Sequence, residues 1–236
     1  MNHQVPPMSA PDLVIFDCDG VLVDSEIIAA RVEARLLTQA GFEITPEEIA
    51  SRYAGLTFKD IMLAIEKEAD MPFQASLIDL AETEVDKRLR NEVRAIDGAR
   101  DAAAGVEGKK CICSNSTRER IEAMLKRNAM LPLFQGHIYS SLETPTKQPK
   151  PAPDVFLYAA EIMQAEPERT FVIEDSVHGI AGAKAAGMRV IGFAGASHIQ
   201  PGHAELLMDA GAETVINRFQ DLAGIMAALS EWGGDI

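Results

Sequence analysis

The stretch Val14-Ile15-Phe16-Asp17-Cys18-Asp19-Gly20-Val21 decides the fold of this chain. Together with Leu13 it begins as an apolar run with a β-branched centre, which is typical of a buried parallel strand. Two carboxylates, one residue apart, follow directly. Charge at the edge of a core is costly unless another group pairs with it or uses it. The sequence therefore predicts a buried strand that ends in a functional carboxylate pair.

The form of this first strand recurs along the chain. Segments with a polar lead-in, an apolar centre and a polar or small end occur at 109–116, 170–176, 188–195 and 213–217. Helical patterns lie between them at 117–128, 153–164 and 176–187, and the last of these ends in Gly187, suited to a left-handed position after a helix. Strands that alternate with helices imply right-handed βαβ units. The predicted fold is α/β, a Rossmann-like parallel sheet sandwiched by helices.

Residues 25–95 interrupt this alternation with helical patterns alone. They include an amphipathic stretch that Gly41 closes, a capping box from Thr45 to Glu48, and further helices over 57–69 and 74–92. Because this block lies between the first two strands, we expect it to be an inserted all-helical domain. Residues 1–24 and 96–236 then form the α/β core domain.

Composition limits the class of protein and its partners. The 236 residues carry a formal net charge of −14, which argues against nucleic acid or an anionic membrane surface as partner. No apolar stretch approaches the roughly 18 residues of a membrane span, and residues 1–12 lack the layout of a secretion signal. Three cysteines in apolar contexts suit a reducing compartment. We expect a cytoplasmic protein that is a monomer or a weak dimer.

Polar residues follow several of the predicted strands. In an open parallel sheet, ligands bind beyond the carboxyl ends of the strands, so these residues share one edge. Carboxylates that converge there repel one another unless a cation lies among them, and oxygen ligands without histidine or thiolate favour Mg²⁺. A metal, an ammonium and a hydroxyl around one centre suit phosphoryl transfer. The residues concerned are Asp17, Asp19, Ser114, Asn115, Lys150, Glu174 and Asp175.

Four motifs in this order resemble the signatures of the haloacid dehalogenase superfamily, and the resemblance covers nearly the whole chain from residue 12. The helical insertion is similar to the small cap of the branch that contains β-phosphoglucomutase and the sugar-phosphate phosphatases. The motifs are Asp17-x-Asp19-Gly20-Val21, Ser114-Asn115, Lys150-Pro151-x-Pro153-Asp154 and Glu174-Asp175-Ser176 before Gly179.

The resemblance implies a role for each residue. Asp17 would be the nucleophile that forms an aspartyl-phosphate, Asp19 the general acid and base, and Lys150 the cation that balances Asp17 and the phosphoryl group. Ser114 belongs to the catalytic set as well. Phosphate would be bound by Gly20, Ser114, Asn115 and Lys150, and Mg²⁺ by Asp17, Asp19, Glu174 and Asp175.

One position departs from the family pattern. Family members often have glycine directly before the lysine, whereas this chain has Gln148-Pro149-Lys150. Lys147 is therefore a rival, although the spacing to Pro153-Asp154 favours Lys150.

The resemblance favours a phosphatase that acts on small phosphate monoesters. Asp19 has no use in dehalogenation, which needs no proton for its leaving group. The mutases of this branch carry a histidine early in the cap, where this chain has Ala29. We expect Mg²⁺-dependent hydrolysis of sugar, polyol or sugar-acid phosphates, since the chain also loosely resembles bacterial phosphatases acting on 6-phosphogluconate. A phosphosugar mutase is the alternative, and a phospho-accepting signalling domain is a remote one.

Two groups of residues keep a second interpretation. Arg52, Thr57 and Lys59 lie in the cap segment that typically faces the core site in this branch, so they are candidates for substrate recognition. The same residues also read as a solvated helix start with Lys59 in its first turn. His178 follows the last motif, and a structural or solvent-facing role is the better interpretation of it.

Overall fold

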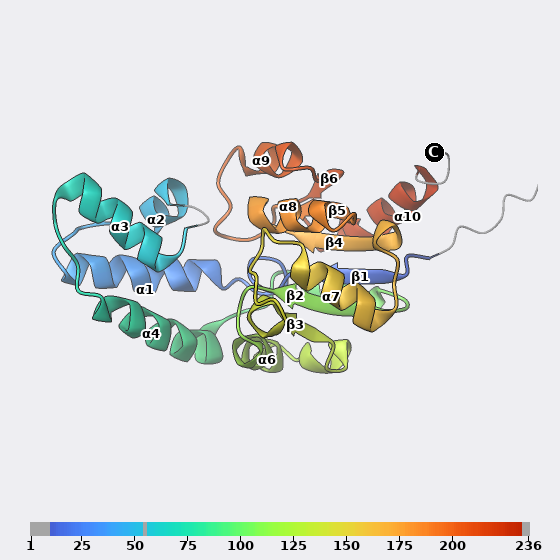
Figure 1. Cartoon of the computed structure of the whole chain (residues 1–236), viewed down its shortest axis with the longest axis horizontal. Helices are drawn as coiled ribbons and strands as arrows, with labels where there is room; N and C mark the ends of the chain where they lie inside the picture. The colour runs from blue at the N-terminus through green and yellow to red at the C-terminus, as the bar shows by residue number, and fades with distance from the viewer. Residues whose placement is uncertain (1–9, 54–55, 233–236) are drawn as a thin grey trace, which may run out of the picture.

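A six-stranded parallel sheet forms the centre of the molecule, which we describe from a computed structural model over residues 10–53 and 56–232 (Figure 1). The strand order is β3-β2-β1-β4-β5-β6, so the chain starts in the middle of the sheet and extends to both sides. β1 therefore has a parallel neighbour on each side, with Ile15 opposite Cys111 and Val172. The strands are β1 (Leu13–Phe16), β2 (Lys110–Ser114), β3 (Ile138–Ser140), β4 (Thr170–Glu174), β5 (Arg189–Phe193) and β6 (Thr214–Ile216).

Five of these strands were predicted, and the α/β parallel-sheet fold is confirmed. The sequence did not indicate β3. That strand has three residues and pairs with β2 alone, at the edge of the sheet. A segment this short has no recognisable alternation of apolar and polar residues, so tertiary pairing rather than local pattern defines it.

Helices cover both faces of the sheet because alternate strand residues point to opposite sides. Val14 and Phe16 pack with α5 (Ala99–Gly105) and α6 (Arg118–Arg127). The alternating Leu13 and Ile15 pack with the helices of the other face. Those helices are α7 (Asp154–Met163), α8 (Val177–Ala185) and α9 (His203–Asp209), while α10 (Leu222–Trp232) packs on the α5 side.

Within the described residues, four helices occupy the expected insertion, and Figure 1 shows them gathered beyond one end of the sheet. Thr45 and Glu48 form the predicted capping box. These helices have an apolar core of their own, to which Leu37, Ile49 and Ile65 belong. That residues 25–95 make up a domain stays a prediction. The helices are α1 (Glu26–Gln39), α2 (Pro46–Arg52), α3 (Phe58–Ala69) and α4 (Ser76–Glu92).

The chain leaves the sheet for these helices and returns along adjacent paths. Asp24 N donates to Arg94 O at 3.0 Å, and Ile96 N donates to Leu22 O at 3.1 Å. Both connections therefore meet next to the end of β1, where the predicted site lies.

No helix in the described ranges is both long and apolar enough to cross a membrane. Residues 1–9, which hold most of the segment considered for a secretion signal, lie outside the described residues.

Gly187 allows a test of how backbone conformation after α8 affects stability. It follows α8 with φ +77°, as the sequence predicts, and an added Cβ would meet only Pro167 Cβ at 3.8 Å. We expect Gly187→Ala to lower the free energy of unfolding by about 1 kcal/mol, because alanine is strained in the left-handed region. Urea unfolding measures the change.

Gly105→Ala is the matched control. Gly105 ends α5 within the helical region, and a Cβ there meets no atom within 4 Å. Alanine at this position should leave the free energy of unfolding unchanged or raise it by up to about 1 kcal/mol. Equal losses in the two variants would contradict the backbone explanation.

Candidate active site

The predicted site residues meet at the carboxyl ends of the three central strands. Asp17 follows β1, Ser114 ends β2 and Glu174 ends β4. In this strand order the chain connections run to opposite sides of β1, and ligands bind at such a point in open parallel sheets. The fold thus brings together residues that are up to 157 positions apart in the sequence (17 to 174).

Lys150 is the centre of this arrangement. Its Nζ donates to Asp17 Oδ1 at 2.6 Å, to Glu174 Oε1 at 2.5 Å and to the Cys113 carbonyl at 2.8 Å. Lys150, Asp17 and Glu174 are all buried. The rival Lys147 is exposed in the same loop. The geometry therefore favours Lys150 over Lys147 as the cation beside Asp17.

Asn115 holds the backbone of Lys150. Its Oδ1 accepts from Lys150 N at 2.9 Å, and its Nδ2 donates to Lys150 O at 3.4 Å. Ser141 Oγ also donates to Asn115 Oδ1, at 2.8 Å. The Asn115 amide is thus occupied with positioning the lysine loop, in addition to the phosphate-binding role that stays a prediction.

Burial and charge shift the pKa values of these groups. Burial raises the pKa of Asp17, and the neighbouring carboxylates add to the rise while Lys150 opposes it. The pKa of Asp175 is raised in the same way, by burial first and then by Glu174. Burial would lower the pKa of Lys150, but Asp17 and Glu174 outweigh it and raise that pKa. The site therefore holds one cation among more carboxylates than it can balance.

Asp19 is surrounded by hydroxyl groups. Ser25 Oγ donates to its Oδ1 at 2.8 Å, and Ser116 and Ser114 donate to its Oδ2 at 2.8 and 3.2 Å. Asp19 is partly exposed, unlike Asp17. A carboxylate that is oriented by three hydroxyls yet reachable from solvent suits an acid and base that exchanges protons with substrate and water.

Glu174 and Asp175 differ in the contacts of their carboxylate oxygens. Both oxygens of Glu174 are occupied, because Oε1 accepts from Lys150 and Oε2 accepts from the Ser176 backbone and hydroxyl at 3.1 and 2.9 Å. Asp175 Oδ2 instead lies where a Cβ on Gly20 would approach it to 1.9 Å. Gly20, with φ +76°, is thus required both for the turn and for this approach.

A metal at this site would draw some of its ligands from outside the protein. Within residues 10–53 and 56–232, no three His, Cys, Asp or Glu side chains are arranged to hold a metal ion by themselves. The excess of buried carboxylates beside Asp17 and Asp175 nevertheless fits a hard cation. Mg²⁺ commonly uses one or two carboxylates and takes its other ligands from water and phosphate. The residues present fit Mg²⁺ in this sense.

The candidate specificity residues lie among helix contacts. Arg52 Nη2 pairs with Glu68 Oε2 at 2.9 Å. Thr57 caps α3, accepting from Asp60 N at 3.2 Å and donating to Asp60 Oδ2 at 2.6 Å. Lys59 is exposed in the first turn of α3. Thr57 and Lys59 lie at the start of α3, as the helix-start interpretation expects, whereas Arg52 lies in the last turn of α2. A role of these residues in specificity stays a prediction.

Several residues near the site were not predicted from the sequence. Ser25 and Ser116 bind Asp19. Ser116 directly follows the Ser114-Asn115 motif, which is a usable signal, whereas Ser25 lies four residues after the end of the first motif. His198 and His203 lie at Asp175, although nothing in their spacing indicates it. His178, for which a structural or solvent-facing role was the better interpretation, is exposed to solvent.

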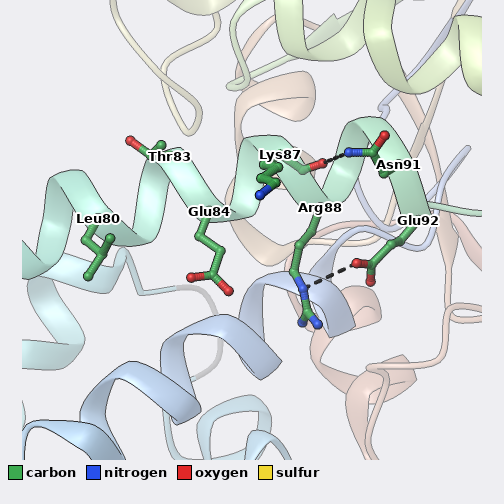
Figure 2. Close-up of a pocket in the computed structure, with 7 residues that line it drawn as sticks. All are labelled: Leu80, Thr83, Glu84, Lys87, Arg88, Asn91 and Glu92. Carbon is green, nitrogen blue, oxygen red and sulfur yellow. Dashed lines mark hydrogen bonds and ion pairs between the residues drawn. The ribbon is translucent and has the colours of Figure 1, made fainter.

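A surface hollow on α4 lies apart from this site. Figure 2 shows Glu84, Arg88 and Glu92 on the side of α4 that faces α1. Arg88 Nε lies 3.4 Å from Glu92 Oε1, and Glu84 pairs with Arg35 of α1. Because these charges satisfy one another, the hollow reads as a solvated helix face. Its lining residues are Leu80, Thr83, Glu84, Lys87, Arg88, Asn91 and Glu92.

Comparison with protein families and curated proteins agrees with this geometry. A family model described as haloacid dehalogenase-like hydrolase matches residues 14–193. The 6-phosphogluconate phosphatase of Escherichia coli (strain K12) is 28% identical over 195 residues, which cover 82% of this chain and 87% of that protein. The phosphorylated carbohydrates phosphatase of Thermotoga maritima is 26% identical over 206 residues, 87% of this chain and 94% of that protein.

Solved structures share the fold. A haloacid dehalogenase-like protein of unknown function from Agrobacterium tumefaciens str. C58 is 53% identical with a TM-score of 0.89, covering 94% of this chain and 100% of its own. A HAD family hydrolase from Deinococcus radiodurans R1, solved with bound phosphate and sodium, is 35% identical with a TM-score of 0.79 over 95% and 98%.

Lys150 should be required for folding stability as well as for chemistry. Lys150→Met leaves Asp17 and Glu174 buried without their cation, and removal of one partner from a buried charge network typically costs about 3–5 kcal/mol. We expect a loss of that size in the free energy of unfolding from urea titration. Lys147→Met, in the same loop, should change it by less than about 0.5 kcal/mol. A larger loss for Lys147→Met would contradict the assignment.

Proposed function

The chain belongs to the haloacid dehalogenase-like hydrolase family, and from this premise we propose that it is a Mg²⁺-dependent phosphatase of small phosphorylated metabolites. The observation that carries the proposal is the position of Asp17. Its Oδ1 is held by Lys150, and Asp19 lies two residues further on, oriented by three hydroxyls. A nucleophile and a separate acid and base are the two protein groups that hydrolysis through an aspartyl-phosphate needs.

The reaction would proceed in two steps. Asp17 Oδ2 attacks phosphorus, the bond to the leaving oxygen breaks, and Asp19 donates a proton to that oxygen. Asp19 then accepts a proton from water, whose oxygen attacks the phosphorus of the aspartyl-phosphate and releases inorganic phosphate and free Asp17. Lys150 remains in place throughout and balances charge on Asp17 and the phosphoryl group.

Mg²⁺ would be held by Asp17 and Asp175, with Asp19 contributing its backbone carbonyl as the family resemblance implies. When bound, the ion supplies neutralisation of the negative charge on the phosphoryl oxygens. Glu174, the other predicted ligand, accepts hydrogen bonds from Lys150 and Ser176 in this structure, and its part in metal binding stays a prediction.

The proposed substrates are sugar, polyol or sugar-acid phosphates. Support comes from the E. coli and T. maritima relatives, whose names give 6-phosphogluconate and phosphorylated carbohydrates as substrates. Arg52 and Thr57 have partners within the inserted helices, and their part in selecting among these classes stays a prediction. A screen of the three classes with release of inorganic phosphate as readout decides the question.

Hydrolysis is favoured over the mutase alternative by Ala29. This residue lies on α1 where the mutases carry a histidine, and its methyl group is partly buried against the apolar core. It offers no group that binds a proton. The likeness to the putative β-phosphoglucomutase of Thermotoga maritima, at 22% identity and TM-score 0.71, shows the fold alone. With glucose 1-phosphate, a phosphatase releases inorganic phosphate and a mutase forms glucose 6-phosphate.

The proposed setting of this enzyme is a reducing compartment, the cytoplasm. Cys18, Cys111 and Cys113 are free and buried. Their burial agrees with residues that pack as small apolar side chains. A monomeric or weakly dimeric state stays a prediction.

Asp17→Asn should abolish turnover. The amide is not a nucleophile toward phosphorus, so we expect kcat for the best substrate of the screen to fall by about 10⁴-fold or more. Circular dichroism checks that the fold is retained. Asp12→Asn is the control at the opposite end of the same strand, where Asp12 pairs with Arg169 at 2.8 Å, and it should keep normal activity. Substantial phosphate release by Asp17→Asn would remove the nucleophile assignment.

Stabilisation by Mg²⁺ should increase with pH. The pKa values of Asp17 and Asp175 are raised above the ordinary 3.8, so the folded protein holds protons that the unfolded chain has lost. Stability without metal therefore falls as pH rises above about 4. Because Mg²⁺ binds deprotonated carboxylates, the rise in melting temperature that it produces should be larger at pH 8 than at pH 5. Asp175→Asn should remove most of that rise, and an equal rise at both pH values would contradict this account.

A further inference from the structure

Two histidines, one in the segment after β5 and one at the start of α9, lie beside Asp175. His203, the first residue of α9, has Nε2 2.6 Å from the Asp175 carbonyl oxygen. A carbonyl only accepts, so this nitrogen carries a proton and donates it. His198 Nε2 lies 3.3 Å from Asp175 Oδ2. The backbone and the carboxylate of one residue thus each have a histidine beside them.

The position of His198 is fixed by close packing around Gly20. A Cβ at Gly20 would come within 1.9 Å of Asp175 Oδ2 and 3.0 Å of His198 Cε1, so the three residues are in mutual contact. The neighbouring Ser197 N donates to Asp24 Oδ1 at 3.2 Å, which ties this segment to the connection leading into α1. The imidazole therefore has little freedom to turn away from Asp175.

Folding stability does not explain a histidine at this place. His198 Nδ1 is buried, and among the described residues it has no hydrogen-bond partner. An unpaired buried polar atom destabilises the folded state, and an apolar side chain of similar size avoids that loss. Histidine differs from leucine here in the approach of Nε2 to Asp175 Oδ2 at 3.3 Å.

We propose that His198 and His203 are positioning residues that orient Asp175 as a ligand for Mg²⁺. His203 fixes the backbone of Asp175, and His198 holds Oδ2 so that the other carboxylate oxygen faces the metal position. Groups that orient a metal ligand in this way commonly raise metal affinity 10- to 100-fold. The inference rests on the proposed function, because that function supplies the metal.

Isothermal titration of the full-length protein with Mg²⁺ alone tests the proposal. We expect His198→Leu to weaken Mg²⁺ binding about tenfold while the melting temperature without metal is unchanged or higher. His198→Gln, whose side-chain amide can donate near the Nε2 position, should bind within about threefold of the wild type. His203→Leu should weaken binding as well, and His203→Gln should restore it. His178→Leu, on the exposed start of α8, is the control that leaves binding unchanged.

The outcomes separate this inference from the proposed function. Wild-type binding that depends on Asp175 but tolerates His198→Leu would overturn the inference and leave the phosphatase proposal standing. A parallel loss of melting temperature in His198→Leu, with no rescue by His198→Gln, would also overturn it, because the histidine would then be structural. A wild-type protein that binds no Mg²⁺ overturns the metal-dependent function, and this inference with it.

Discussion

The contact of Lys150 with Asp17 and Glu174 is the constraint on which the site depends. Each of these groups alone would be costly to bury, and removal of any one leaves an uncompensated charge. Their mutual distances of 2.6 and 2.5 Å require the ends of β1 and β4 and the loop before α7 to stay in a single register. These contacts can therefore form only when the sheet is correctly assembled.

The strand order explains why this contact forms where it does. β1 lies between β2 and β4, so the residue after β1 has polar strand ends on both sides, and Cys113 O and Glu174 both reach the lysine. Burial is the main cause of the raised pKa values of Asp17 and Asp175, and the neighbouring carboxylates raise them further although Lys150 opposes the rise. An additional cation relieves the repulsion between the carboxylates, which is the physical reason to expect a metal beside these two residues.

The sequence predicts this centre well because its parts are coded locally. An apolar run fixes β1, and Asp17 and Asp19 follow it directly, so the sheet geometry alone places them at the ligand edge. Lys150 follows from the same edge argument, with the family resemblance to decide between it and Lys147. Thr57 and Lys59 show the limit of local signals, since the same residues fit both substrate recognition and a helix start, and the structure places them at the start of α3.

Other features depend on tertiary contacts that no local pattern records. β3 has three residues and is defined by its pairing with β2. His198 and His203 reach Asp175 only because the segment after β5 folds back over the end of β4. Such a segment has no periodicity to read, and an isolated histidine in it looks like any polar loop residue.

Asp19 is hydrogen-bonded both to residues at the end of the sheet and to the residue before the inserted helices. Ser114 and Ser116, from the end of β2 and the loop after it, hold one of its oxygens, and Ser25, immediately before α1, holds the other. Asp24, one residue earlier, is bonded both to the returning connection at Arg94 and to the His198 segment at Ser197. The Asp19 carboxylate is thus oriented jointly by the sheet and by the start of the inserted helices. A displacement of α1 at this point changes the hydrogen bonding of Asp19 itself, so under the proposed function the position of the helical insertion relative to the core affects the group proposed to transfer protons.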